Sequence, residues 1–270
     1  MLKFWRTYNL AKSFLLGTFA SLILFIVGRN FDNSVVLLTF ISVFLMFIGL
    51  HALNWIFEID FEGNKHKRMF SKVTKDKGLI FAAVVPILAS FALSAAYLSS
   101  WASLVIFGNV LVTSLYGMFK HKYPLISVTK AYLIASVVLF STAVVGINRV
   151  FIVPALLAFC IIFVYESLKT IAIGKLEKYQ RMTFVSLHGE KTAGMVIAGV
   201  ILGLVATGFI PIIYYPYAYL FLIGVADIFF VYVAYRMIID PVKYAQESKW
   251  FILAGGIIAI IAFVVGTFAG

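Results

Sequence analysis

Acidic and amide side chains recur at four-residue intervals in one polar stretch of an otherwise apolar sequence. Asn54, Glu58 and Glu62 share this spacing, which places them on one face of a helix. Two carboxylates one turn apart repel unless a cation or a basic partner lies between them. Such oxygen ligands suit Mg²⁺ shared with a phosphate substrate. Lys65 and Arg68 follow directly and can grip that phosphate.

A simpler interpretation of this stretch remains open. Glu58, Asp60 and Glu62 can mark a solvated helix end, followed by basic residues that flank a membrane span on its cytoplasmic side. His51 and Asn54 favour a functional site, because polar side chains deeper within a span are costly and tend to serve function.

A second polar stretch covers residues 165–191 and mirrors the first, which covers residues 54–77. Glu166 stands near the expected membrane boundary, Lys169 follows one helical turn later, and Glu177 lies further along. An ion pair within the helix is the simplest interpretation of Glu166 and Lys169.

The elements that carry these residues are set by composition. Apolar residues make up 63% of the chain and charged residues 12%, whereas globular proteins have about 45–50% and about 25%. Lipid is therefore the expected solvent, and long uninterrupted apolar runs indicate helices rather than a barrel. Cys160, the one cysteine, excludes a disulfide framework or a cysteine metal cluster.

The apolar runs predict an all-α, polytopic membrane protein with nine transmembrane helices, since each run approaches the about 20 residues that a span needs. The first of them is short. The predicted spans are Ser13–Val27, Val35–Phe57, Gly78–Leu98, Ala102–Phe119, Val128–Ile147, Phe151–Leu168, Thr192–Gly208, Tyr214–Tyr235 and Trp250–Ala269.

Basic residues orient these spans in the cell membrane. With a cytoplasmic N-terminus and an external C-terminus, all but Arg29 and Arg149 of the 22 basic residues fall on the cytoplasmic side, as the positive-inside rule requires. This sorting accounts for the net charge of +11 through contact with anionic lipid headgroups. Nucleic-acid binding is therefore not expected.

With both polar stretches in view, the sequence resembles the UbiA superfamily of intramembrane prenyltransferases. It is most similar to archaeal members that attach a geranylgeranyl chain to a glyceryl phosphate lipid. The resemblance runs from end to end. It rests on Leu2, Arg6 and Asn9; on Asn54, Glu58, Glu62, Asn64, Lys65 and Arg68; on Glu166, Lys169, Thr183 and Gly189; and on Asp227, Asp240, Pro241, Ser248 and residues 262–266.

The chain departs from this family at its acidic motifs. In the first motif Trp55 replaces one aspartate, and Glu58 and Glu62 replace the other two. In the second motif Thr170 and Ile173 take two aspartate positions, Tyr165 takes an arginine position, and Glu177 keeps a carboxylate. Glutamate still ligates metal, but a second metal site loses ligands.

The resemblance implies one transmembrane domain over residues 1–270, a helical bundle around a central cavity. It implies an isoprenyl diphosphate held through Mg²⁺ between the two motifs, and a lipid or aromatic acceptor. The implied catalytic residues are Asn54, Glu58, Glu62, Glu166 and Glu177, with Glu58, Glu62 and Glu177 on the metal and Lys65, Arg68, Lys120 and Lys169 on the diphosphate.

Two other functions remain open. A diverged homologue can bind prenyl lipids, or serve as a partner subunit, without chemistry, as the replaced aspartates suggest. A small-molecule transporter is suggested by Asp227 and Glu166 at membrane depth. For Asp227 itself we expect a structural hydrogen bond or ion pair between helices.

Overall fold

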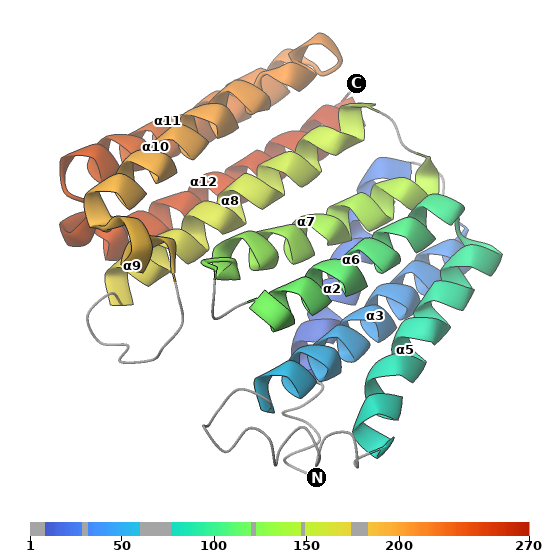
Figure 1. The fold of residues 1–270 in the computed structure, drawn as a ribbon. Helices are drawn as coiled ribbons and strands as arrows, with labels where there is room; N and C mark the ends of the chain where they lie inside the picture. Colours follow the sequence, from blue (N-terminus) through green and yellow to red (C-terminus); the bar gives the residue numbers. More distant parts are fainter. Residues whose placement is uncertain are drawn as a thin grey trace. The chain divides into compact units, whose positions relative to one another are not determined.

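A computed structural model describes residues 9–28, 32–59, 77–119, 123–146, 149–173 and 183–269. Within these ranges all regular secondary structure is helical, as Figure 1 shows. The all-α prediction is confirmed. The helices are α2 (Leu10–Gly28), α3 (Asn33–Ile59), α5 (Lys77–Tyr97), α6 (Ser100–Phe119), α7 (Ile126–Val145), α8 (Arg149–Ile173), α9 (Phe184–His188), α10 (Glu190–Gly208), η1 (Ile210–Ile213), α11 (Tyr217–Ile239) and α12 (Pro241–Ala269).

Among the described residues, eight helices are long and apolar enough to cross a membrane, and a shorter apolar helix covers Leu10–Ile26. The predicted count of nine is therefore approximate and depends on that short helix. The last span begins earlier than Trp250, because α12 starts at Pro241. Asp240 caps it by accepting a 3.0 Å hydrogen bond from the Lys243 backbone N–H, and proline suits the first helical position.

The chain divides into two compact units, and one of the three points at which it passes between them falls within α7. The N-terminal unit comprises residues 1–118 and 136–147, and the C-terminal unit comprises residues 119–135 and 148–270. Each unit is described by itself. The single domain and the central cavity expected from the sequence stay predictions.

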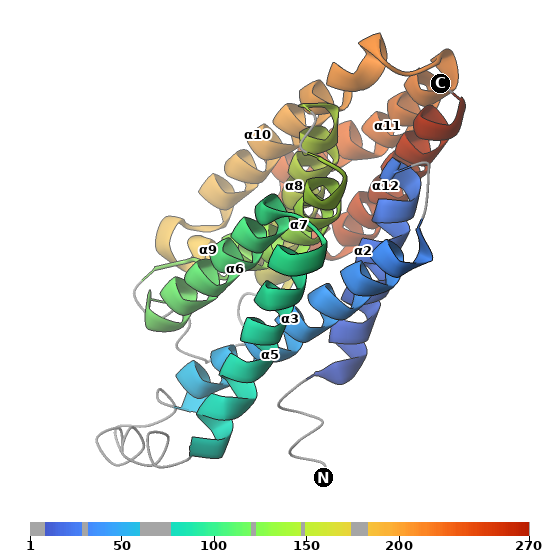
Figure 2. The same ribbon diagram turned by 90° about the vertical axis from the view of Figure 1, so that its right-hand side faces the viewer.

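Serine hydroxyls tie helices of the N-terminal unit to one another by donating to backbone carbonyls. The bonds join Ser21 to Val36 (3.1 Å), Ser90 to Ser42 (2.7 Å), Ser99 to Ala143 (2.7 Å) and Ser141 to Ala20 (2.8 Å). The α3 and α5 helices also touch at Gly49, where an added Cβ would lie 2.8 Å from the Ala83 carbonyl oxygen. Figure 2 shows α3 between α2 and α5. Small residues thus bring the backbones into contact.

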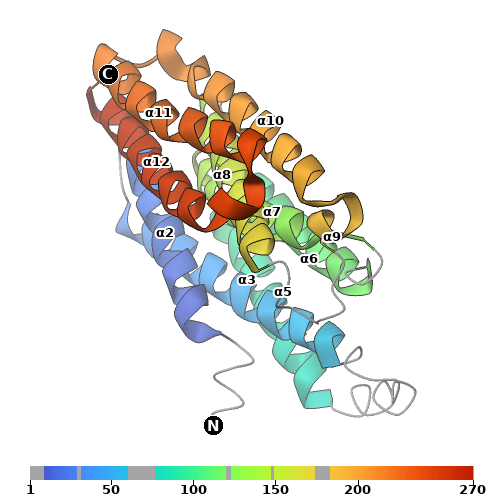
Figure 3. The same ribbon diagram turned by 90° about the vertical axis from the view of Figure 1, so that its left-hand side faces the viewer.

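The C-terminal unit is a bundle in which α8, α10, α11 and α12 run side by side (Figures 1 and 3). Its core consists of buried aliphatic side chains with Tyr219 and Phe230. Gly194 brings α10 against the end of α11, and Gly255 brings α12 against Phe230. The short α9 lies against α8 and α10.

Gly194 offers a test of this close packing. An added Cβ would lie 2.5 Å from the Met237 carbonyl oxygen, whereas a Cβ on Gly199 would meet nothing within 4 Å. We expect Gly194→Ala to lower the free energy of unfolding by about 1–3 kcal/mol, since backbone must move. Gly199→Ala should preserve or raise it by up to about 1 kcal/mol through helix propensity. Thermal unfolding in detergent measures both, and equal effects would contradict the packing.

Candidate functional site

The second predicted acidic patch begins on α8, which continues to Ile173, beyond the predicted end of its span at Leu168. Glu166, Lys169 and Thr170 are therefore all helical. The Thr170 hydroxyl donates a 2.9 Å hydrogen bond to the Glu166 backbone carbonyl. The side chain at this family aspartate position is thus engaged within its own helix.

Glu166 is paired with Lys130 of α7, in the same unit. Lys130 Nζ lies 2.6 Å from Glu166 Oε2, and the side chains are 44% and 17% exposed respectively. The expected pairing of Glu166 with Lys169 is wrong: Lys169 is exposed and forms no ion pair with any described residue. Both Lys130 and Glu166 lie within apolar spans, where a charge without a partner is costly.

Lys130 is not among the predicted site residues, because its sequence position is explained by the basic residues expected on the cytoplasmic side. A signal for it was present, because Lys130 stands inside the apolar segment Ile126–Val145. An ionisable residue at such a position marks a functional or paired group by default. Its partner could not be chosen from sequence, since all six glutamates of the chain fall on the predicted cytoplasmic side.

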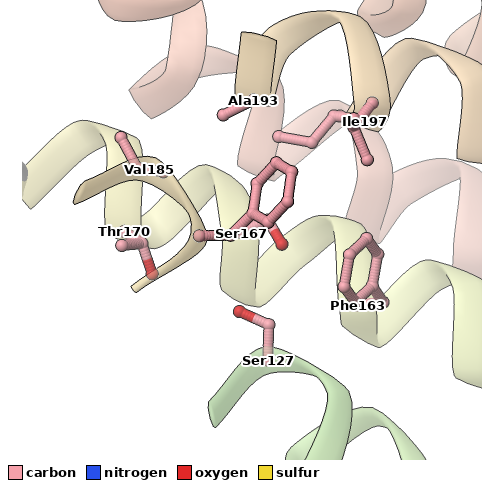
Figure 4. A pocket seen from close by; sticks show the side chains of 9 residues that line it. Ser127, Phe163, Ser167, Thr170, Val185, Ala193 and Ile197 are labelled. Carbon is pink, nitrogen blue, oxygen red and sulfur yellow. The ribbon is translucent and has the colours of Figure 1, made fainter. Parts of the chain in front are cut away.

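A small pocket opens within the C-terminal unit, and two of its lining residues, Ser167 and Thr170, stand within one helical turn of Glu166 on α8. Its walls come from α7, α8, α9 and α10. Ser127 and Ser167 are buried in them, and neither hydroxyl hydrogen-bonds to another described residue. Figure 4 shows the Ser127 hydroxyl pointing toward the α8 side chains. The lining residues are Ser127, Phe163, Ser167, Thr170, Phe184, Val185, Ala193, Val196 and Ile197.

Two residues of the family pattern shape one wall of this pocket. Thr183 caps α9 through a reciprocal pair of bonds with Ser186, in which each side chain accepts from the other's backbone N–H at 3.1 Å and 2.9 Å. Gly189 joins α9 to α10 with φ at 80°, a conformation that favours glycine. This connection places Phe184 and Val185 on the pocket.

The first predicted patch begins on α3, which extends to Ile59. Asn54 and Glu58 share this helix, as their spacing predicts, and Asn54 is half-buried. One turn before Asn54, His51 has a buried Nε2 atom without a hydrogen-bond partner among the described residues. The Glu58 side chain and the whole of five predicted site residues lie outside the described residues: Glu62, Lys65, Arg68, Lys120 and Glu177.

The predicted magnesium site is therefore not tested by the geometry. Within the described ranges no group of three or more histidine, cysteine or acidic residues could hold a metal ion. The side chains of its predicted ligands, Glu58, Glu62 and Glu177, are not described. The meeting of the two patches across one pocket also stays a prediction, because they belong to different units.

Asp227 on α11 departs from its expected structural role. Its side chain is 7% exposed, and neither carboxylate oxygen has a hydrogen-bond partner in the described part of the chain. The hydroxyl of Tyr219 donates instead to the Gly208 carbonyl at 2.7 Å. The predicted interhelical hydrogen bond of Asp227 is thus wrong.

Comparison with known proteins connects these features to one family. Residues 14–256 match the sequence model of the UbiA prenyltransferase family, whereas none of the curated proteins matches the sequence. A solved digeranylgeranylglyceryl phosphate synthase aligns over 99% of this chain and 98% of its own, with a TM-score of 0.84 and 20% identity.

Two archaeal UbiA homologues also share the fold. One, from Archaeoglobus fulgidus and bound to DMAPP and Mg²⁺, aligns over 99% of this chain and 98% of its own, with a TM-score of 0.62 and 14% identity. The other, an apo structure from Aeropyrum pernix K1, aligns over 93% of this chain and 98% of its own, with a TM-score of 0.55 and 13% identity. The likeness in fold thus extends over almost the whole chain.

Two aspartates should respond oppositely to substitution. Asp227→Asn is expected to preserve or raise the midpoint of thermal unfolding, because it removes a buried ionisable group that has no described partner. Asp240→Ala should lower the free energy of unfolding by about 1 kcal/mol, since the cap of α12 is lost. Melting curves in detergent compare them. A loss of stability for Asp227→Asn as large as that for Asp240→Ala would show that Asp227 has a structural partner.

Proposed function

Because this chain belongs to the UbiA prenyltransferase family, we propose that it is an intramembrane enzyme that transfers an isoprenyl group from an isoprenyl diphosphate to a lipid or aromatic acceptor, assisted by Mg²⁺. The family match over residues 14–256 carries this proposal. The Archaeoglobus homologue bound to DMAPP and Mg²⁺ supports the substrate class and the metal. The digeranylgeranylglyceryl phosphate synthase fold supports a lipid acceptor.

The chemistry asks the protein to stabilise a leaving diphosphate. Breaking the allylic carbon–oxygen bond puts negative charge on the diphosphate and positive charge on the prenyl group. Preorganised cations stabilise the negative charge on the diphosphate, and aromatic faces can stabilise the positive charge on the prenyl group. The acceptor then supplies the electron pair for the new bond and loses a proton.

The predicted site residues divide this work. Bound Mg²⁺ would supply Lewis-acid stabilisation of the diphosphate, held by Glu58, Glu62 and Glu177. Asn54 lies one turn before Glu58 and would orient the diphosphate. Glu166 would add a carboxylate on α8. The diphosphate itself would contact Lys65, Arg68 and Lys120, and Lys169 would serve Glu166, which it follows by one turn on α8.

A non-catalytic homologue that binds prenyl lipids is the second candidate. One observation favours it. Thr170 stands at an aspartate position of the family pattern, and its hydroxyl donates a hydrogen bond to the α8 backbone. Ile173, at the next such position, is apolar. The α8 end therefore offers fewer metal ligands than the family pattern does.

An activity assay separates the two candidates. Purified protein is incubated with Mg²⁺, a labelled C20 diphosphate and candidate lipid acceptors, beside an active family member. We expect prenylated product and released diphosphate, and an about 100-fold or greater loss of kcat in the Glu58→Gln/Glu62→Gln variant, as for removal of charge stabilisation at the reacting group. Lys191→Gln, an exposed lysine on α10, is the control and should match wild type. Absence of both products from wild type would favour the binding protein.

The proposed orientation places both acidic patches at the cytoplasmic face. In a Cys160→Ser background, Asn64→Cys and Asn148→Cys introduce single thiols on predicted opposite sides. A membrane-impermeant maleimide on intact cells should label the variant at position 148. The variant at position 64 should react only after permeabilisation. The reverse pattern would refute a cytoplasmic N-terminus.

A further inference from the structure

We propose that Lys130 binds the diphosphate and that Glu166 pairs with the Lys130 ammonium while the site is empty. When the diphosphate binds, Lys130 pairs with it and the Glu166 carboxylate forms an ion pair with Lys169 instead. This exchange rests on the proposed function. It assigns to Lys130 a ligand of one chemical class, the diphosphate of an isoprenyl donor.

The Lys130–Glu166 pair has the form of a resting contact. One carboxylate oxygen lies 2.6 Å from the ammonium, in a geometry typical of a charge-assisted hydrogen bond. The Lys130 side chain is 44% exposed although it is paired, whereas that of Glu166 is 17% exposed. A ligand can therefore approach the ammonium without unfolding either helix, and the flexible stem of lysine allows it to turn.

Membrane depth explains why release needs a second partner. Both residues stand within apolar spans, and removing one member of a part-buried pair leaves the other charge uncompensated, at high cost. A diphosphate compensates Lys130. The Glu166 carboxylate then needs another cation.

Lys169 is placed to be that cation. It follows Glu166 by three residues on α8, a spacing at which glutamate and lysine meet on one helix face. In the structure it is exposed and forms no ion pair with another described residue. The two charges within the spans, Lys130 and Glu166, thus each have a partner both before and after the exchange.

The hydroxyls of two serines near Lys130 also favour binding of an anionic oxygen group. Ser127 precedes Lys130 by about one turn of α7, and Ser167 follows Glu166 directly on α8. Both line the same pocket, and neither hydrogen-bonds to another described residue. Phosphoryl oxygens accept from such hydroxyls as well as from an ammonium.

Binding of an unreactive isoprenyl thiodiphosphate to the full chain in detergent tests Lys130. We expect Lys130→Met to raise the Kd about 10- to 100-fold, the range for loss of a hydrogen bond to a charged group. Lys130→Arg should retain most of the affinity, and Lys191→Gln should bind like wild type. A Kd for Lys130→Met equal to that of wild type would overturn the proposal.

Glu166→Gln tests whether that residue only holds the ammonium. The substitution removes the competitor of the diphosphate, so the Kd should be unchanged or lower. An increase in Kd as large as that of Lys130→Met would overturn this role. Because Lys130→Met leaves Glu166 unpaired and can impair folding, the Lys130→Met/Glu166→Gln variant, which removes both charges, is measured beside it and should also bind weakly.

Lys169→Gln tests the exchange itself. In the wild-type background it should raise the Kd, because Glu166 would have no cationic partner once Lys130 binds the diphosphate. In the Glu166→Gln background it should leave the Kd unchanged, because no carboxylate needs a partner. Equal increases in both backgrounds would mean that Lys169 contacts the diphosphate directly and would overturn the exchange. Failure of the wild type to bind the analogue at all would refute the proposed function. If the wild type binds and turns over substrate but Lys130→Met has the wild-type Kd, this inference alone is refuted.

Discussion

Close contact between helix backbones is the constraint on which the rest of this structure depends. In lipid the hydrocarbon chains are as apolar as the helices, so the hydrophobic effect does not drive helices together. Here the helices meet where small residues stand, at Gly49, Gly194 and Gly255. Serine hydroxyls add bonds from one helix to the carbonyls of another. Small and polar residues therefore allow the backbones to meet, while aliphatic side chains fill the core of the C-terminal unit.

The same medium governs the charges of the candidate site. An ionised side chain in a span is stable only beside a partner, and Lys130 with Glu166 meets this condition across two helices. The ammonium of Lys130 remains accessible in this pair, since its side chain is 44% exposed. Asp227 is the exception, since its buried oxygens have no partner among the described residues.

Low identity with high structural similarity follows from these requirements. At 20% identity the fold still aligns with a TM-score of 0.84, because many aliphatic sequences satisfy a lipid-facing surface. Chemistry tolerates less. Glu58 and Glu62 keep a carboxylate at two positions of the first motif, whereas Thr170 and Ile173 lose it at two positions of the second.

The sequence alone determined the all-α membrane class, the approximate positions of the spans, and the family, because apolar run length and motif order are local properties of the chain. It also placed Asn54 and Glu58 on one helix, since a four-residue spacing fixes a helical face. Only the tertiary structure decided that Glu166 pairs with Lys130 rather than Lys169, and that Asp227 has no hydrogen-bond partner among the described residues. Those outcomes depend on which helices pack together. Whether Glu166 pairs with a lysine one turn away or with one on another helix depends on distances in space, which sequence spacing does not give.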